Sequence, residues 1–122
     1  MAIITGVDGL TSVAINRTRR GPVGKHTLIR HIVFFTANAD QNIDAICEGL
    51  SLLGTIEHAS HFEVTRNAKV DQISNEVDVV VYAEFADAAA LAAYKAHPTY
   101  AEATRRVRPL RELRLSADFT AQ

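Results

Sequence analysis

Hydrophobic residues alternate with polar ones in several stretches of the chain, and a period of two predicts β-strands. The alternation is clearest over residues 76–85 and 110–120, and residues 28–36 (LIRHIVFFT) form a third such stretch. Residues 56–66 are a less regular extended segment. β-Branched and aromatic side chains are frequent in these stretches, as they are in strands generally. The pattern therefore predicts four strands.

Residues 39–53 show the 3.6-residue spacing of an amphipathic helix. Its apolar stripe consists of Ile43, Ile46, Cys47, Leu50 and Leu53. Asn38 or Asp40 is expected to cap the start of this helix, and Gly54 is expected to end it. Because Cys47 lies in the stripe, we expect a small buried hydrophobe there and not a reactive thiol.

A second helix is predicted over Ala88–Ala96, an alanine-rich run of strong helix formers after the third strand. Asp87 is placed to cap its first turn, and Pro98 is expected to stop it. The spacing Thr99-x-x-Glu102 matches a capping box. It predicts a further helical turn or two before the fourth strand.

The resulting order of elements is βαββαβ, the ferredoxin-like pattern of the α+β class, with a four-stranded antiparallel sheet and helices on one face. The other face of the sheet is then uncovered. In the first strand Val33 and Phe35 share one face and Ile32 and Phe34 the other, so both faces are apolar. A large uncovered apolar face predicts a partner, and pairing of two identical copies is the commonest solution. We therefore predict a homodimer through the open sheet face, a dimeric α/β barrel.

The first 27 residues differ in composition from the rest of the chain. They hold four of the six glycines and a basic cluster of Arg17, Arg19, Arg20 and Lys25. We divide the chain into an N-terminal arm, residues 1–27, packed on the domain or on a partner subunit, and a ferredoxin-like domain, residues 28–122. A nucleic-acid- or anion-binding arm is the less favoured alternative, because no aromatic residues are interleaved with the basic ones.

Composition is that of an ordinary globular protein, with 48% hydrophobic and 22% charged residues among 122. A net charge of −1 gives no reason to expect nucleic acid or a membrane surface as partner. The single cysteine excludes an intramolecular disulfide and suits a reducing compartment. No apolar run approaches the roughly 20 residues that span a bilayer, and the N-terminus lacks a signal-peptide pattern. We expect a cytoplasmic protein.

His58 and His61 are the residues that first raise the question of a metal site. Residues three apart on an extended strand point to opposite faces, so the pair is not expected to chelate one ion. No metal site and no cofactor are predicted.

Four segments together resemble the Dabb domain family, the stress-responsive dimeric α/β barrels. They are IRHIVFF at 29–35, FEVTRN at 62–67, VVVYAEFADAAALAAYKAHP at 79–98 and SADF at 116–119. They follow one another in the family's order and spacing over residues 28–120, and F-x-D before an alanine-rich helix together with Y-x-x-HP at its end is fairly specific. The resemblance implies a ferredoxin-like domain that dimerises through its sheet.

The resemblance also implies a pocket between sheet and helices, because a plant polyketide cyclase of the family uses a tyrosine and a histidine there. Tyr94 matches that tyrosine, His31 matches a strand-one histidine that lines the pocket, and His97 matches the histidine of the HP motif. The cyclase's general base lies two residues after that proline, where this chain has Tyr100. The candidate catalytic residues are therefore His31, Tyr94 and Tyr100. The expected pocket residues are Val33, Phe35, Phe85, Leu91 and His97.

Two functions remain as hypotheses. The favoured one is a dimeric, stress-associated protein that is structural or binds a small apolar or aromatic molecule, without turnover. It is favoured because position 100 holds a tyrosine, and a tyrosine with a pKa near 10 is a poor base at neutral pH. His31 and Tyr94 would then be core residues with polar tips, and His97 a helix-capping residue. The alternative is a cofactor-free enzyme, polyketide cyclase-like or monooxygenase-like, with His31 as base and a small aromatic or polyketide-type substrate.

Overall fold

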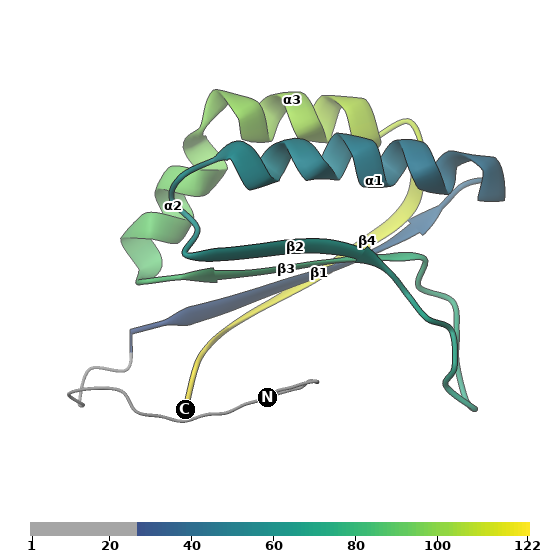
Figure 1. Ribbon diagram of the computed structural model, residues 1–122, viewed down its shortest axis with the longest axis horizontal. Helices are drawn as coiled ribbons and strands as arrows, with labels where there is room; N and C mark the ends of the chain where they lie inside the picture. The colour runs from purple at the N-terminus through teal and green to yellow at the C-terminus, as the bar shows by residue number, and fades with distance from the viewer. Residues whose placement is uncertain (1–26) are drawn as a thin grey trace.

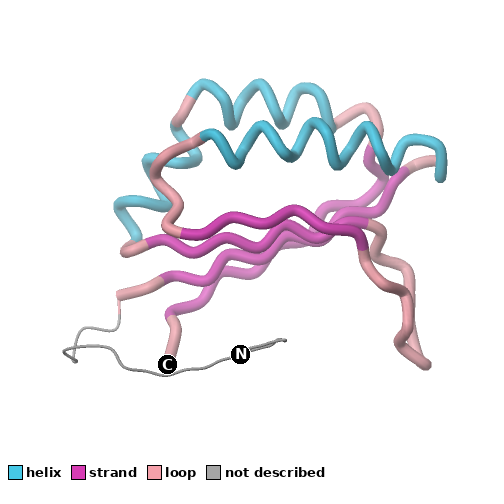
Figure 2. The backbone as a smooth tube through the Cα atoms, in the orientation of Figure 1, coloured by secondary structure: helices cyan, strands magenta, loops and turns pink. Residues whose placement is uncertain are grey.

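A computed structural model describes residues 27–122, which form two layers: one sheet, with all the helices on one of its faces (Figures 1 and 2). The strands are β1 (Ile29–Ala37), β2 (His61–Arg66), β3 (Val79–Phe85) and β4 (Arg111–Thr120). They are all antiparallel and lie in the order β2-β3-β1-β4. This arrangement confirms the predicted ferredoxin-like fold. The proposed N-terminal arm lies outside the described residues, except for Thr27.

The helical layer has three α-helices: α1 (Ile43–Ser51), α2 (Ala88–Ala96) and α3 (Pro98–Val107). Short 3-10 turns flank α1, η2 at Asp40–Asn42 and η3 at Leu52–Thr55. Figure 1 shows α1 and α3 side by side above the sheet, with α2 at one end. Pro98 separates α2 from α3, because the residue before it, His97, is extended (φ −69°, ψ 141°).

The core lies between the two layers, where one face of each central strand meets the helices. Val33 and Phe35 of β1 and alternate residues of β3 are buried on this face. Ile46 and Leu50 of α1 and Val107 of α3 cover them from above. The face predicted for each residue of the first strand is therefore confirmed, since side chains alternate across a strand.

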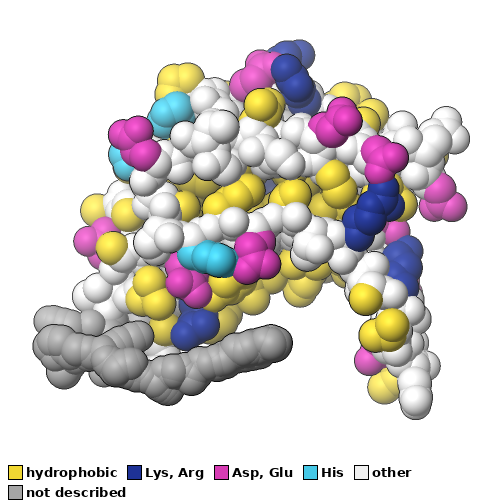
Figure 3. Space-filling view, viewed as in Figure 1, with side chains coloured by type: hydrophobic (Ala, Val, Ile, Leu, Met, Phe, Trp, Pro, Cys, Tyr) yellow, Lys and Arg dark blue, Asp and Glu magenta, His cyan; other side chains and the backbone are white. Residues whose placement is uncertain are grey.

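The open face of the sheet carries large exposed hydrophobic side chains. The most exposed are Phe34, Leu113, Leu115 and Phe119. Figure 3 shows hydrophobic side chains gathered below the strands on this side of the molecule. The connection from β2 to β3, residues 67–78, extends past the sheet on the same side and holds exposed Val70 and Ile73 (Figure 1). Among the described residues no helix is long and apolar enough to cross a membrane.

Three local predictions were wrong. Residues 57 and 58 form a turn, and β2 begins at His61, not at residue 56. Neither Asn38 nor Asp40 caps α1, because η2 precedes that helix and makes Asn42 its N-cap, without a side-chain hydrogen bond. Gly54 lies within η3, where a Cβ would come within 3.0 Å of the Phe62 ring.

The predicted capping box at Thr99 and Glu102 is also wrong. His97 is the N-cap of α3, and its Nδ1 accepts a hydrogen bond of 3.0 Å from the backbone N–H of Thr99. Pro98 then occupies the first helical position, which needs no N–H donor. Glu102 instead accepts hydrogen bonds from Arg105 and Arg106. The cap predicted at Asp87 is confirmed, since its Oδ1 accepts from the N–H of Ala90 at 2.9 Å.

Candidate functional site

A cavity of about 400 Å³ lies between the helical layer and the sheet. Both layers contribute to its apolar wall, β1 and β3 from one side and α1, η3 and α3 from the other. The apolar residues that line it are Val33, Phe35, Leu50, Leu53, Val81, Ala103 and Val107. Its volume is in the range of small-molecule pockets.

His31 on β1 lies near one end of the cavity and is 1% exposed. Its Nδ1 is in hydrogen-bond contact with Oδ1 of Asp118, because the antiparallel register of β1 and β4 sets these two residues opposite each other. A carboxylate at Nδ1 favours the tautomer with the hydrogen on that nitrogen, which leaves the lone pair on Nε2 free. Lys95 Nζ lies 4.0 Å from the other carboxylate oxygen of Asp118.

Two tyrosines are among the residues that line the cavity. Tyr94 is fully buried, and its hydroxyl has no hydrogen-bond partner within residues 27–122. Burial raises the pKa of Tyr94 well above its ordinary value, and Tyr100 adds to this effect while Arg114 opposes it. The phenol is therefore neutral at physiological pH. The rings of Tyr94 and Tyr100 meet edge to face with centroids 5.4 Å apart.

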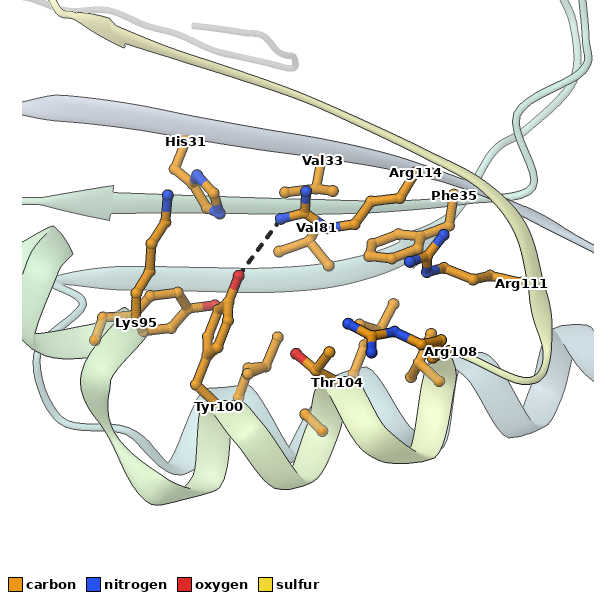
Figure 4. Close-up of a pocket in the computed structure, with 15 residues that line it drawn as sticks. His31, Val33, Phe35, Val81, Lys95, Tyr100, Thr104, Arg108, Arg111 and Arg114 are labelled. Carbon is orange, nitrogen blue, oxygen red and sulfur yellow. Dashed lines mark hydrogen bonds between the residues drawn. The ribbon is translucent and has the colours of Figure 1, made fainter.

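Three arginines line the other end of the cavity. Arg108 follows α3, Arg111 begins β4 and Arg114 lies three residues further on. Figure 4 shows that they extend toward the cavity from the side of α3 and β4. Arg114 Nη2 donates a hydrogen bond of 3.4 Å to the hydroxyl of Tyr100. In the described part of the chain, no carboxylate oxygen lies within 4.0 Å of these three guanidinium groups.

A β-bulge sets Arg111 and Arg114 on the same face of β4. Phe35 pairs with Arg114 and Thr36 with Leu113, but Ala37 pairs with Arg111, so the pairing passes over Glu112. One extra residue in a strand reverses the alternation of the side chains that follow it. Two residues three apart, which would otherwise point to opposite faces, therefore both reach the cavity.

The structure brings five of the eight predicted site residues together at this cavity. They are His31, Val33, Phe35, Tyr94 and Tyr100. His31 contacts Tyr94 ring to edge, with centroids 6.0 Å apart, but within residues 27–122 no hydrogen bond joins it to either tyrosine.

The three other predicted residues lie elsewhere. Phe85 is buried behind the cavity and packs on His31 and Tyr94, with a centroid distance of 4.8 Å to the tyrosine. Leu91 is partly buried against the core, and His97 serves as the cap of α3. None of these three is among the residues that line the cavity.

The polar residues that sequence reasoning missed are those of α3, its end and β4. They include Asp118, Arg108, Arg111 and Arg114, together with Lys95 and Thr104. The alternation of β4 gave one signal, since it groups Arg114, Ser116 and Asp118 on one side. That side faces the helices, and the apolar side of the strand is the exposed one.

Metal-ligating side chains do not gather in the described part of the chain. Within residues 27–122 there is no group of three or more histidine, cysteine, aspartate or glutamate side chains that could hold an ion. His61 is exposed on the open sheet face beside Glu63, while the ring of His58 lies near that of His97. Cys47 is partly buried, and burial raises the pKa of its thiol, which disfavours the reactive thiolate.

The fold and the cavity define a class, a single antiparallel sheet with one helical layer and a pocket between them. The chain belongs to the stress responsive A/B barrel domain (Dabb) family, whose sequence model matches residues 29–121. This match confirms the resemblance stated from the sequence. No curated protein matches the chain.

Several solved structures share the fold. A Dabb family protein with a ferredoxin-like fold from Mesorhizobium loti is 27% identical, covering 79% of this chain and 98% of that one, with a TM-score of 0.67. A dimeric ferredoxin-like protein of unknown function from Thermobifida fusca is 19% identical, covering 85% and 100%, with a TM-score of 0.68. A hydroxynitrile lyase from Passiflora edulis is 16% identical, covering 80% and 95%, with a TM-score of 0.67.

Proposed function

We propose that this protein is a homodimeric small-molecule-binding protein whose ligand occupies the cavity between sheet and helices. The observation that carries the proposal is the cavity itself: about 400 Å³, with an apolar wall and a few polar groups directed at one space. Ligand sites commonly combine these properties. The hydroxyl of Tyr94 adds support, since a buried hydroxyl without a partner costs about 1–3 kcal/mol, which a ligand polar group would recover.

Binding is tested by filling the cavity. Thr104 lines it from α3 and is partly buried, so Thr104→Phe is expected to occupy part of the space without disturbing the core. Ala101→Phe adds the same ring to the exposed side of that helix and is the matched control. A thermal-shift screen with small aromatic acids, amides and ketones is expected to give ligands that stabilise the wild type and the control but not Thr104→Phe. Ligands that stabilise all three proteins equally would contradict the proposal.

The dimeric part of the proposal rests on the open sheet face. Phe34, Leu113, Leu115 and Phe119 are 38–55% exposed there, and Val70 and Ile73 extend the apolar surface beyond the sheet. Large exposed hydrophobic side chains on one side of a molecule are typical of an interaction site. Solved structures from Bacteroides fragilis, Thermobifida fusca and Jannaschia with this fold are described as dimeric, which supports a second copy as the partner. The lone cysteine agrees with a cytoplasmic location, which we include in the proposal.

A second candidate function is cofactor-free acid–base catalysis in the same cavity. The observation that favours it is the His31–Asp118 pair, because an oriented imidazole with a free Nε2 is suited to abstract a proton. The hydroxyls of Tyr94 and Tyr100 would orient the carbonyl oxygen of a substrate. This function ranks second because the chain has Tyr100 at the position where the family's cyclase has its general base.

Proton abstraction can be measured without knowledge of the natural substrate. In D₂O, 4-phenyl-2-butanone exchanges the hydrogens next to its carbonyl, and proton NMR follows the rate. Catalysis predicts faster exchange with the wild type than with His31→Ala, and no such difference for His61→Ala, whose histidine is on the open face. Equal rates with all three proteins and in buffer alone would exclude this function for phenylalkyl ketones.

A further inference from the structure

The two ends of the cavity differ in charge. At the end formed by His31, the carboxylate of Asp118 contacts the imidazole and lies 4.0 Å from Lys95 Nζ. At the other end are Arg108, Arg111 and Arg114, and no carboxylate of residues 27–122 comes within 4.0 Å of them. The histidine end therefore contains its own counter-charge, and the arginine end does not.

An arginine cluster without a counter-ion is unfavourable in a partly enclosed space. Like charges repel more strongly where low-dielectric walls replace water. Arg111 and Arg114 are both partly buried, and both reach the cavity because of the bulge at Glu112. The neighbouring arginines Arg105 and Arg106 of α3 show the contrast, since both pair with Glu102 at the surface.

We infer that the ligand of this cavity carries one anionic oxygen group, a carboxylate, which the three arginines bind, and that its apolar body extends toward Tyr94. This inference rests on the proposed binding function and names its ligand class. Guanidinium groups bind carboxylates through paired hydrogen bonds in a fixed geometry. The apolar body would lie against Val33, Val81 and Val107. A hydroxyl or carbonyl at its far end would meet the unpartnered hydroxyl of Tyr94.

The size of the cavity favours an acid with an apolar body over a bare anion. An inorganic anion would fill a small part of about 400 Å³ and leave the apolar wall without a partner. A hydrocarbon without a charge would leave the arginines without a counter-ion. A small aromatic or aliphatic carboxylic acid matches both parts of the cavity, and its carboxylate would also approach the Tyr100 hydroxyl that Arg114 already contacts.

The test compares acids with amides of the same shape. Calorimetric titration of the whole chain uses 4-phenylbutanoic acid, 2-naphthoic acid and decanoic acid, each beside its primary amide, and inorganic phosphate as the bare anion. We expect at least one acid to bind roughly 10–100-fold more tightly than its amide, the effect of one charge-assisted contact. Raising the salt concentration is expected to reduce the difference.

Variants assign the effect to the arginines. Arg111→Gln and Arg114→Gln are expected to bind acid and amide about equally. Arg105→Gln removes the same charge from the exposed side of α3 and is expected to keep the wild-type preference. Circular dichroism and the melting temperature verify that each variant is folded. If Arg111→Gln or Arg114→Gln does not fold, Arg108→Gln, at the exposed end of α3, serves as a third variant.

Each outcome has one interpretation. A preference for the acid that is lost in the strand variants and kept in Arg105→Gln supports the inference. Acid and amide binding equally well to the wild type would overturn the inference and leave the proposed binding function intact. If phosphate binds as tightly as the best acid, the apolar body adds nothing to the affinity, and the inference that one ligand fills both the arginine end and the apolar part of the cavity is overturned. If no acid or amide binds at millimolar concentration, the inference is overturned, and the proposed binding function fails with it only if the ketones of the thermal-shift screen do not bind either.

Discussion

Tyr94 combines complete burial with a hydroxyl that has no hydrogen-bond partner in residues 27–122. Its ring packs between Phe85 and Tyr100, which explains why the sequence places an aromatic residue at this point of α2. Packing does not explain the hydroxyl, since phenylalanine would make the same ring contacts. The hydroxyl is therefore the part of this residue that points to a ligand.

Tyr94→Phe separates the two roles. Without ligand, we expect the free energy of unfolding to remain the same or to rise by up to about 1 kcal/mol, because the variant no longer buries an unsatisfied polar group. Urea denaturation measures this value. Ligand binding is expected to weaken in the same variant. Tyr100→Phe is the comparison, since it removes a hydroxyl that does have a partner, Arg114. A loss of more than about 1.5 kcal/mol in Tyr94→Phe would mean that the hydroxyl is satisfied in the unliganded protein.

Asp78 is a second polar residue whose ionisation is set by its surroundings. Burial raises its pKa, but hydrogen bonds from Lys69 Nζ and from the backbone N–H of Ala37 outweigh that effect, so the pKa is lowered from its ordinary 3.8. A carboxyl with a lowered pKa in the folded state stabilises the fold above its unfolded pKa. That contribution is lost as the pH falls through the folded value.

We therefore expect Asp78→Asn to lose about 1–2 kcal/mol of stability at pH 7, the value of hydrogen bonds to a charged group. The difference from the wild type is expected to shrink as the pH falls from 5 to below 3.8, the ordinary pKa of this carboxyl. Denaturation at a series of pH values measures it. Glu76→Gln, an exposed carboxyl in the same connection, is expected to show little effect at any pH. A stability difference between the two proteins that grows on acidification would contradict this prediction.

At the scale of elements, β4 is the strand that contributes side chains both to the cavity and to the open face of the sheet. Its apolar residues, such as Leu115, lie on the open face, while Arg114 and Asp118 lie on the face toward the helices. An amphipathic edge strand ordinarily turns its apolar face to the core. The reversed orientation here gives the cavity its polar groups and the open face its apolar surface. One strand thus contributes to both the proposed ligand site and the proposed dimer interface.

The element order, the faces of β1 and the helix limits set by Asp87 and Pro98 could be predicted because they depend on local periods and local chemistry. Two features of β4 could not. The pairing of His31 with Asp118 depends on a register between residues far apart in sequence. Arg111 and Arg114 lie on the same face of β4 because of a bulge. Simple alternation along the strand would have predicted opposite faces for these two residues. A capping role was expected for His97, but not its role as N-cap of α3, because a ring nitrogen, and not a hydroxyl or carboxylate, accepts that hydrogen bond.

The contact of α1 with α3 gives a prediction for an element. A Cβ on Gly49 would lie 2.9 Å from Cγ2 of Val107, which is itself buried. Gly49→Ala is expected to destabilise the fold by about 1 kcal/mol, since overpacking costs roughly 1–3 kcal/mol and exceeds the gain in helix propensity. In the double variant Gly49→Ala/Val107→Ala, the alanine at 49 is expected to cost less. Urea denaturation of the four proteins gives this coupling, and a stabilised Gly49→Ala would contradict the close approach.

At the scale of the whole molecule, the two faces of the sheet have separate tasks in this account. The helix face would hold the ligand in its cavity, and the open face would meet a second copy. Leu115→Glu places a charge on the open face without touching the cavity, so we expect it to produce monomers that still bind ligand. Ala101→Glu, with the same charge on the exposed side of α3, is expected to remain dimeric. Light scattering at micromolar concentration measures the mass. A monomeric wild type would refute the interface.

The most direct test of the central claim is to locate the bound molecule. With methyl-labelled protein and the tightest-binding acid from the titrations, NMR detects contacts between ligand protons and individual methyl groups. We predict contacts to Val33, Val81 and Val107, which line the cavity. Contacts confined to Ile32, Val80 and Leu115 would contradict it, because those side chains belong to the open face of the sheet.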